Sequence, residues 1–467
     1  MIKKQILCLL MGLLVLSSCD TGGGDDATGQ DVPHPPKPPV VEFKWGVQGV
    51  YDFNFNDFGE HKTEVKQAIP TAVKDEEDFL YISSVNDHGM MVGDVYFPIV
   101  GYPGYFAGYP VAIKFDETSH KFSSSIETQD IDNDQWGLFP LFYQFFNYVA
   151  NPDANGKSSV YLAASFPLDQ EAPYTHFATF LTEYVYDSNS QQGKISNQQT
   201  VSTFDTTKAI AEELHASPDG SYIFTAPAYY IDKSTPTVAM SRVFKNANNT
   251  RSKITMQYDQ NYFHEKGDKW LFQGPGDDMS NNHIFIGFDA NPASCDQDGC
   301  KFSALVICKV NDTTLVASCH MLTDFYVNNV ERSNTAKIAP NGQYIYAVQR
   351  TTASKTGEKQ LVTIDPNTYK VSPVKELTGV TRVLQVFDNG SVMVGDSKAA
   401  YIYSPTQKAW APVYSLLTAA NIDHPEQYQL MTLSPDGQYF VFMNTKVTEK
   451  SDDATAIYKV VKLSKML

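Results

Sequence analysis

The chain has 467 residues, of which 42% are hydrophobic and 19% are charged, and its formal net charge at pH 7 is −17. So acidic a chain is not expected to bind nucleic acid, which requires a basic surface. The same charge disfavours electrostatic adsorption to an anionic membrane. A local basic pocket for an anionic ligand is still compatible with this composition.

The N-terminal residues indicate export. Lys3 and Lys4 precede an apolar run at 6–16, which at about eleven residues is too short to span a bilayer and is typical of a signal peptide. The run ends in Leu16-Ser17-Ser18-Cys19, which resembles the lipobox of bacterial lipoproteins. The resemblance implies a signal peptide at 1–18 and a diacylated Cys19, since two acyl chains give stable anchoring. The alternative is an ordinary signal peptide followed by a chance cysteine.

Residues 19–42 are predicted to be a tether. They begin with an acidic, Gly-rich stretch and continue into the Pro-rich stretch 33–39, and neither can build a core. An acidic stretch directly after the lipidated cysteine resembles the surface-export signal of Bacteroidetes lipoproteins. The resemblance implies a lipid anchor in the outer membrane and exposure at the cell surface. Residues 43–467 are expected to form the folded domain.

One sequence pattern repeats along this domain. Three good copies have a Pro-Asp-Gly or Pro-Asn-Gly turn followed by an aromatic strand, as in Ser217-Pro218-Asp219-Gly220, and they lie at 215–224, 338–346 and 433–441. Pro fixes φ at the first corner of the turn, Asp or Asn caps the turn, and Gly accepts positive φ. Four weaker copies have their turns at 86–89, 151–156, 277–282 and 388–390.

Seven units at intervals of roughly 45 to 70 residues are typical of a propeller with four strands in each blade. The turn and the aromatic strand resemble the blades of TolB-like and WD40-like bacterial propellers, although the Gly-His and Trp-Asp signatures of WD40 repeats are missing. We therefore predict an all-β fold, a β-propeller of seven blades with four antiparallel strands each. The alternative is two consecutive β-sandwiches.

The last unit predicts how the ring closes. It supplies strands at 429–433, 439–443 and 455–463 and then runs out of chain, so we expect residues 44–55 to form its fourth strand. Such closure would also remove exposed sheet edges. Only three segments look compatible with a helix, and they lie near 62–69, 207–213 and 415–420.

Four cysteines remain in the expected domain: Cys295, Cys300, Cys308 and Cys319. Four cysteines allow three pairings. We predict disulfides Cys295–Cys300, across the turn at 296–299, and Cys308–Cys319, across the turn at 311–314. The alternative is a four-cysteine zinc site, which fits worse because the spacing is unusual for zinc and exported thiols oxidise.

Aromatic residues provide the candidate binding surface. Residues 96–110 carry six aromatic rings among Gly and Pro, and we expect a loop between the second and third strands of the first unit. Such rings could stack on a sugar or an aromatic ligand. The alternative is a loop that packs on itself and covers the end of the propeller. Other connections predicted on the same face are also aromatic. The candidate ligand-binding residues are Tyr96, Phe97, Tyr102, Tyr105, Phe106, Tyr109, Trp136, Tyr229, Tyr230 and Tyr262.

Motifs for metal binding and catalysis are weak or missing. Asp130, Asp132 and Asp134 alternate as in a calcium loop, but Gln135 and Leu141 replace residues that the loop requires, so a solvated acidic turn is preferred. No metal or other cofactor is therefore predicted. The sequence has no G-x-S-x-G, no H-E-x-x-H and no phosphate-binding glycine loop. His215 precedes a repeat turn and is predicted to pack within its strand.

The leading hypothesis is a non-catalytic surface lipoprotein that binds a small molecule or a glycan, such as a siderophore or an oligosaccharide, on its aromatic face. It would pass this ligand to an outer-membrane transporter, and its other contact would be with the membrane through the lipid. One alternative is a TolB-like scaffold for protein partners in the envelope. Another is a carbohydrate-active enzyme, because propeller glycosidases and lyases draw carboxylates from distant blades.

Overall fold

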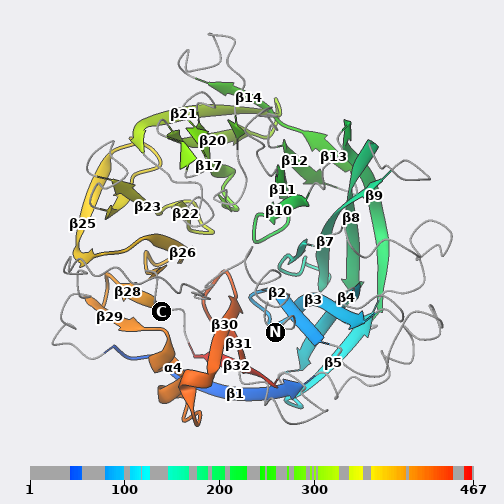
Figure 1. Cartoon of the computed structure of the whole chain (residues 1–467), viewed down its shortest axis with the longest axis vertical. Coiled ribbons are helices and arrows are strands. Elements are labelled where there is room, and N and C mark those ends of the chain that lie inside the picture. Colours follow the sequence, from blue (N-terminus) through cyan, green and yellow to red (C-terminus); the bar gives the residue numbers. More distant parts are fainter. Residues whose placement is uncertain are drawn as a thin grey trace.

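A computed structural model gives the fold of the chain between residues 43 and 464 (Figure 1). The ranges that it describes are 43–54, 79–98, 106–116, 118–126, 146–167, 176–187, 192–205, 211–228, 242–247, 250–258, 271–272, 278–290, 295–296, 299–300, 303–325, 336–350, 359–395, 399–444 and 457–464. The predicted signal peptide and tether lie outside these ranges. Among the described residues, no helix is long and apolar enough to cross a membrane.

Seven sheets are arranged around one axis, as predicted, and form a β-propeller of seven four-stranded antiparallel blades (Figure 1). Blade 1 contains β2 (Phe79–Val85), β3 (Met91–Pro98), β4 (Phe106–Asp116) and β5 (Lys121–Ile126). Blade 2 contains β6 (Phe146–Val149), β7 (Lys157–Pro167), β8 (His176–Asp187) and β9 (Gln192–Asp205). Blade 3 contains β10 (Ala211–Ala216), β11 (Tyr222–Ala228), β12 (Arg242–Ala247) and β13 (Thr250–Lys253).

The remaining four blades follow in chain order. Blade 4 is built on β16 (Asp278–Met279), β17 (Ile284–Ala290), β20 (Ser303–Asn311) and β21 (Val316–Phe325), with β14 (Thr255–Tyr258) and β15 (Leu271–Phe272) added at its edges. Blade 5 contains β22 (Ala336–Ile338), β23 (Ile345–Arg350), β24 (Lys359–Ile364) and β25 (Val371–Thr378). Blade 6 contains β26 (Arg382–Val386), β27 (Val392–Gly395), β28 (Ala400–Ser404) and β29 (Ala409–Pro412). Blade 7 contains β30 (Tyr428–Leu433), β31 (Tyr439–Asn444), β32 (Ile457–Leu463) and β1 (Val47–Asn54).

The second strand of each blade lies between its neighbours and is buried on both faces. β31 reads YFVFMN and its first five residues are buried, and all four residues of β27 are buried. β-branched and aromatic side chains suit such strands because they fill the space between twisted sheets. The core is therefore a series of apolar layers between adjacent blades.

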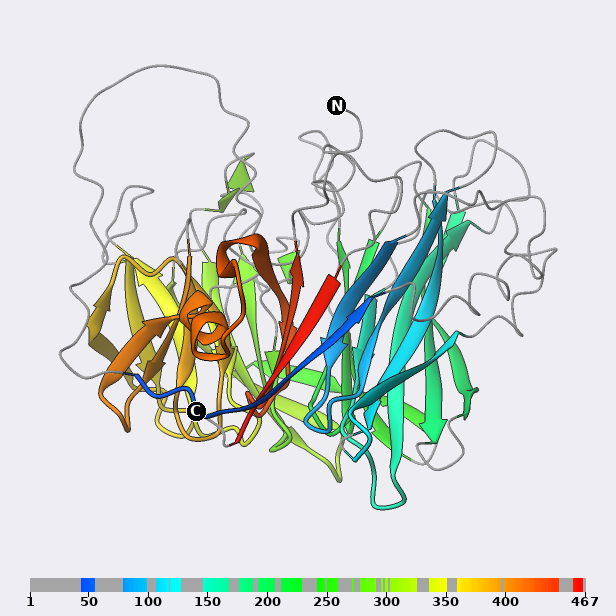
Figure 2. The same cartoon turned by 90° about the horizontal axis from the view of Figure 1, so that it is seen from below.

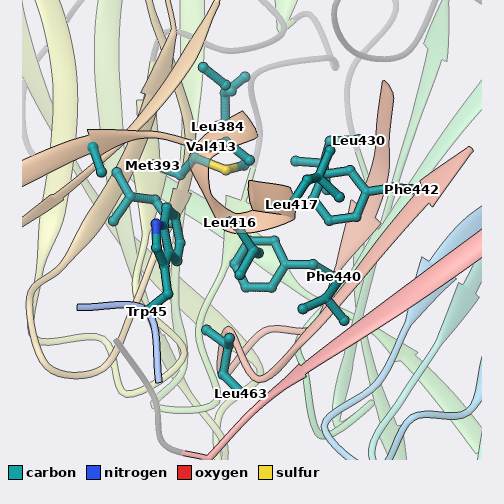
Figure 3. Packing of buried hydrophobic residues seen from close by; sticks show 14 of the residues in the cluster. Trp45, Leu384, Met393, Val413, Leu416, Leu417, Leu430, Phe440, Phe442 and Leu463 are labelled. Atoms are coloured by element: carbon teal, nitrogen blue, oxygen red, sulfur yellow. The ribbon is translucent and has the colours of Figure 1, made fainter. Parts of the chain in front are cut away.

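The predicted ring closure is confirmed. β1 pairs antiparallel with β32, with Val50 opposite Val461 and Phe53 opposite Tyr458, so the N-terminal strand completes the last blade. Just before β1, the Trp45 side chain is 6% exposed and its indole Nε1 donates to Ser415 Oγ at 2.9 Å. Trp45, Leu463 and Phe440 belong to one apolar cluster between blades 6 and 7 (Figure 3).

Helices are few among the described residues. The one predicted near 415–420 is α4 (Tyr414–Ala419), followed by the 3-10 turn η6 (Pro425–Gln427), and both lie between β29 and β30. The helical interpretation of 207–213 is wrong where the structure describes it, because Ala211 and its successors form β10 and pair with β11. Strand pairing outweighs local helix propensity there. The segment near 62–69 lies outside the described residues.

The ends of the blades differ in their connections. The turn between the first and second strands is short in every blade, whereas the step from β5 to β6 runs from residue 126 to 146 and that from β21 to β22 from 325 to 336. Because neighbouring strands are antiparallel, the turns between first and second strands all lie at one end of the blades. These turns define the short-turn face of the ring, and Figure 2 shows the ring from the side.

Candidate functional site

The inner strands of the seven blades have one feature in common. In each strand the last residue is apolar, and the residue before it is polar. These polar residues occupy equivalent positions, one residue from the short-turn end, and we call them the axial ring. The axial ring consists of Ser84, Tyr148, His215, Asp278, Lys337, Gln385 and Thr432.

Burial separates the axial ring from the residues that follow it. Ser84 is 7% exposed and the other six ring residues are half-buried, whereas six of the seven final strand residues, such as Val386 at 0%, are buried. The apolar residues pack between the blades. The polar residues therefore keep partial access to solvent in the middle of the molecule, where burying polar groups without partners would cost several kcal/mol each (about 2–7).

Two ring residues bridge neighbouring blades in the same way. Ser84 Oγ of blade 1 accepts the backbone N–H of Val149 in blade 2 at 3.4 Å, and Asp278 Oδ2 of blade 4 accepts that of Ile338 in blade 5 at 3.0 Å. Asp278 Oδ1 also accepts the N–H of Met279 at 3.0 Å. These two ring side chains thus reach towards the next inner strand and accept one of its backbone N–H groups.

The ionisable ring residues lie on four consecutive blades and influence one another. Burial raises the pKa of Asp278, and the positive charge of Lys337 opposes this shift. Burial also raises the pKa of Tyr148 well above its ordinary value, and the nearby carboxylates of Asp278, Asp87 and Asp219 raise it further. The Tyr148 hydroxyl therefore stays protonated and is available as a hydrogen-bond donor.

His215 is held in the neutral form. Burial, and to a smaller extent the charge of Lys337, lowers the pKa of His215 to about 3. Its ring lies 6.4 Å from that of Phe224 on the adjacent strand, which agrees with the prediction that it packs within its strand. A neutral imidazole offers one donor and one acceptor. Blades 2 to 5 therefore present an ammonium, a carboxyl group, a phenol and an imidazole at one level of the axis.

A second set of polar contacts lies one step closer to the surface. Each turn between the first and second strands contributes to what we call the turn ring, with the turns at 86–89, 150–156, 217–220, 280–283, 339–342, 387–390 and 434–437. In the three turns that contain the Pro-Asx-Gly motif, the backbone amide of the Asx residue donates to the side chain of the second residue in the next blade's turn. These bonds are Asp219 to Asn281 at 3.0 Å, Asn341 to Asp388 at 2.7 Å and Asp436 to Asp87 at 2.7 Å.

Turns without this motif use a different donor. The backbone amide of their second residue donates either to the side chain of the second residue in the next turn or to the carbonyl oxygen of the Pro at that position. These bonds are Asp87 to Asn151 Oδ1 at 2.9 Å, Asn151 to Pro218 O at 2.8 Å and Asn281 to Pro340 O at 2.7 Å. Six of the seven blade junctions are joined in one of these two ways. The Pro and Asx residues of the repeated turns therefore provide the hydrogen bonds that join neighbouring blades.

The predicted aromatic surface is only partly within the described structure. Tyr96 and Phe97 lie on β3, and Phe106 and Tyr109 on β4, where Tyr96 pairs with Gly108 and Phe97 with Ala107. The predicted loop at 96–110 is therefore shorter than expected, because the strands of blade 1 continue into it. The remaining candidates, Tyr102, Tyr105, Trp136, Tyr229, Tyr230 and Tyr262, lie outside the described residues.

The cysteines are placed as the predicted pairing requires. Cys308 and Cys319 form a disulfide between β20 and β21, where they are cross-strand partners. Cys295 and Cys300 are also cross-strand partners, in the short hairpin of β18 (Cys295–Asp296) and β19 (Gly299–Cys300). The weak metal candidates Asp130, Asp132 and Asp134 fall outside the described residues, among which no group of three or more His, Cys, Asp or Glu side chains could hold a metal ion.

Sequence reasoning missed the axial ring. Each member lies two residues before the turn-ring segment of its blade, but the members differ in residue type, and Asp278 falls within the turn predicted at 277–282. The signal that could have revealed the ring is a polar residue followed by an apolar residue at the end of each inner strand, just before the turn. It becomes visible only when the seven strand ends are aligned.

Comparisons with known proteins identify no family. No protein-family model matches the chain, and no curated protein matches its sequence. Among solved structures, it is similar to prolyl oligopeptidase B from Galerina marginata (11% identity, TM-score 0.42, covering 87% of this chain and 54% of that one). It is also similar to the polysaccharide lyase Uly1 (8% identity, TM-score 0.37, 82% and 77%) and to a luciferin-regenerating enzyme (9% identity, TM-score 0.31, 68% and 91%). Such distant likenesses say nothing of activity.

Proposed function

We propose that this protein is a ligand-binding propeller that binds a small polar molecule at its axial ring. The observation that carries the proposal is the make-up of the ring. All seven positions are polar, and four consecutive blades present Tyr148, His215, Asp278 and Lys337, each with a different hydrogen-bonding chemistry. Joining blades needs no such diversity, because the turn ring joins them with Asx side chains and backbone groups alone.

The ring suits recognition of a ligand that has both donors and acceptors. Lys337 donates only, Asp278 accepts when ionised, and Tyr148 and neutral His215 can do both. A few polar groups that converge within an otherwise apolar surrounding fix the orientation of a small ligand. We propose a small molecule or a sugar residue of a glycan as the ligand class, with a siderophore or an oligosaccharide as the first compounds to test.

Location and transport are part of the same proposal. The lipobox at Cys19 and the tether at 19–42 support anchoring to the outer membrane at the cell surface, where a captured ligand would be passed to an outer-membrane transporter. The strand ends that carry Tyr96, Phe97 and Phe106 lie at the opposite end of blade 1 from the turn at 86–89. We propose that this end of the blade contacts the transporter, since a small ligand at the axial ring cannot span the length of a blade.

The test is a thermal-shift screen of the mature protein with siderophores, oligosaccharides, amino acids and nucleosides. A specific ligand at about 100 times its Kd adds about 2.7 kcal/mol to the stability of the folded state and raises its Tm by a few degrees. The proposal requires that the shift be lost in Lys337→Met and retained in Asp153→Asn, a turn substitution in blade 2 away from the axial ring. Capture of an envelope protein without any ligand shift would favour the scaffold instead.

A further inference from the structure

One turn of the turn ring ends in a residue type that the others lack. The last turn residue is Gly in six blades, with φ between +70° and +81°. In blade 4 the same position is His283, with φ +64°. A side chain at positive φ strains the backbone, and such strain is concentrated at functional sites. A histidine that the turn accommodates at this cost indicates a role for its side chain.

The His283 side chain meets two oxygen atoms. Its Nδ1 lies 3.2 Å from the hydroxyl of Tyr222, at the start of β11, and 3.2 Å from Asp312 Oδ1, in the turn between β20 and β21. The Tyr222 hydroxyl also donates to Asp312 Oδ1. Blades 3 and 4, which are neighbours in the ring (Figure 1), thus bring one imidazole nitrogen and two oxygens together.

The surrounding structure fixes all three side chains. Tyr222 is 1% exposed and packs in the apolar cluster between blades 3 and 4. The His283 carbonyl oxygen accepts the N–H of Val310 at 2.8 Å, and Asn311 Oδ1 accepts the N–H groups of the two threonines that follow Asp312. The side chains of His283 and Asp312 are 42% and 35% exposed, so an ion can reach them from solvent.

This cluster is not needed to join the two blades. Asn281 Oδ1 accepts the Asp219 N–H across the same junction at 3.0 Å. Five other junctions have a turn-ring bond of the same kind and a Gly at the position of His283. The histidine is therefore an addition to a junction that is already joined.

The distances suit a metal ion. Ligand atoms that lie about 2.0–2.2 Å from a transition-metal ion are about 2.8–3.5 Å from one another. Both distances from His283 Nδ1 fall within that range. Asp312 Oδ2 lies 3.1 Å from Lys245 Nζ, and such an outer hydrogen bond orients a ligating carboxylate. The set has a tyrosine in place of a third His, Cys, Asp or Glu side chain.

We propose that Tyr222, His283 and Asp312 bind one Fe³⁺ ion at the junction between blades 3 and 4. A phenolate and a carboxylate are hard anionic oxygen ligands, which a trivalent ion prefers, and imidazole is a common ligand of iron. Binding displaces the hydroxyl proton of Tyr222 to solvent. Three protein ligands leave further coordination positions for water, on the side where His283 and Asp312 are exposed.

Titration of the full mature chain with Fe³⁺, supplied as its citrate complex, tests the proposal. Wild type is expected to bind one ion per chain in equilibrium dialysis and to gain the visible charge-transfer absorption of an iron phenolate. Tyr222→Phe keeps the buried ring but should lose this absorption and bind Fe³⁺ at least about tenfold more weakly. No such absorption in wild type, or the same absorption in Tyr222→Phe, would overturn the proposal.

His283→Gly separates binding of the ion from stability of the fold. The variant has in blade 4 the residue that the other six turns have, so its Tm should stay within a few degrees of that of wild type. Its affinity for Fe³⁺ should nevertheless fall at least about tenfold, and Asp312→Asn should weaken binding similarly. A folded His283→Gly variant that binds as tightly as wild type would contradict the proposal, as would tighter binding of Zn²⁺ than of Fe³⁺ by wild type.

Two controls complete the set. His424 also has a positive φ, +53°, and its Nδ1 lies 3.4 Å from Glu426 Oε1, so His424→Gly removes a comparable surface histidine at another place. Lys337→Met removes a residue of the axial ring. Both variants should bind Fe³⁺ as wild type does, whatever ligand the axial ring binds. A tenfold loss in either control would place the ion elsewhere and overturn the proposal.

Discussion

Asp278 on the inner strand of blade 4 accepts the backbone N–H of Ile338 on the inner strand of blade 5, at 3.0 Å from Oδ2. The bond joins two blades at the level of the axial ring. The Asp278 side chain thus accepts a cross-blade hydrogen bond with one oxygen, while its second oxygen accepts the backbone N–H of Met279 in its own strand.

This bond predicts a graded effect of substitution. Asp278→Ala leaves the Ile338 amide without its acceptor and should lower the free energy of unfolding by about 1–3 kcal/mol. Asp278→Asn keeps a carbonyl oxygen at the same place and should cost clearly less. Urea unfolding at pH 7 measures both, and equal losses for the two variants would show that the cross-blade bond contributes little.

His215 predicts a pH dependence of stability. Its pKa is about 3 in the folded chain, against an ordinary value of about 6.5, so only the unfolded chain takes up a proton between these values. Wild type should therefore lose stability from this group as the pH falls from 6.5 towards 3. His215→Gln should lack this loss, so its Tm relative to wild type should rise steadily below pH 6.5. A constant difference in Tm at all pH values would contradict a histidine that the fold keeps neutral.

The turn glycines allow a matched pair of substitutions. Gly437 has φ +72° and a Cβ there would lie 2.6 Å from Phe387 of blade 6, whereas Gly379 has φ +75° and nothing within 4 Å of the same position. Gly379→Ala should cost only the backbone strain, about 1–2 kcal/mol. Gly437→Ala should cost more, because the turn of blade 7 must move away from blade 6. Denaturant unfolding of the two variants measures the difference. Equal losses in the free energy of unfolding would mean that Phe387 moves aside at no cost.

Trp45 predicts how strongly the N-terminal segment holds the closed ring. Its indole is buried between blades 6 and 7 and lies 4.9 Å from the ring of Phe43 and 6.4 Å from that of Phe440. Trp45→Ala should destabilise the fold by about 3–5 kcal/mol through the cavity that it leaves. Tyr414→Ala, on the neighbouring helix, is the control, because its side chain is 59% exposed and its loss should change stability by at most about 0.5 kcal/mol. Similar unfolding midpoints for both would show that the segment is not part of the core.

Much of the fold could be predicted from sequence, because the turn chemistry is local. The Pro-Asx-Gly motifs at 218–220, 340–342 and 435–437 require a tight turn whatever surrounds them, and their spacing together with that of the four weaker copies predicts seven blades. The closing strand could also be predicted, since the last unit ends at β32 with one strand missing. Segment 211–216 could not be assigned in this way, because its pairing with β11 is a tertiary effect.

The candidate site was harder to predict for a physical reason. Aromatic residues on a Gly/Pro-rich stretch predict a binding loop, yet β3 and β4 extend through part of residues 96–110. The axial ring is made of single ordinary residues, and Ser84, Gln385 and Thr432 would pass unnoticed in any strand. Their importance lies in their common position around the axis, which only the closed ring creates.

Direct measurement of binding at the axial ring tests the central claim. Isothermal titration of the best compound from the screen should give a Kd at least about tenfold weaker for Lys337→Met and Tyr148→Phe than for wild type, since a hydrogen bond to a charged group contributes about 1.5–3 kcal/mol and other hydrogen bonds somewhat less. Asp153→Asn should bind as wild type does. Unchanged affinity in both ring variants, with folding intact, would place the ligand elsewhere and contradict the account.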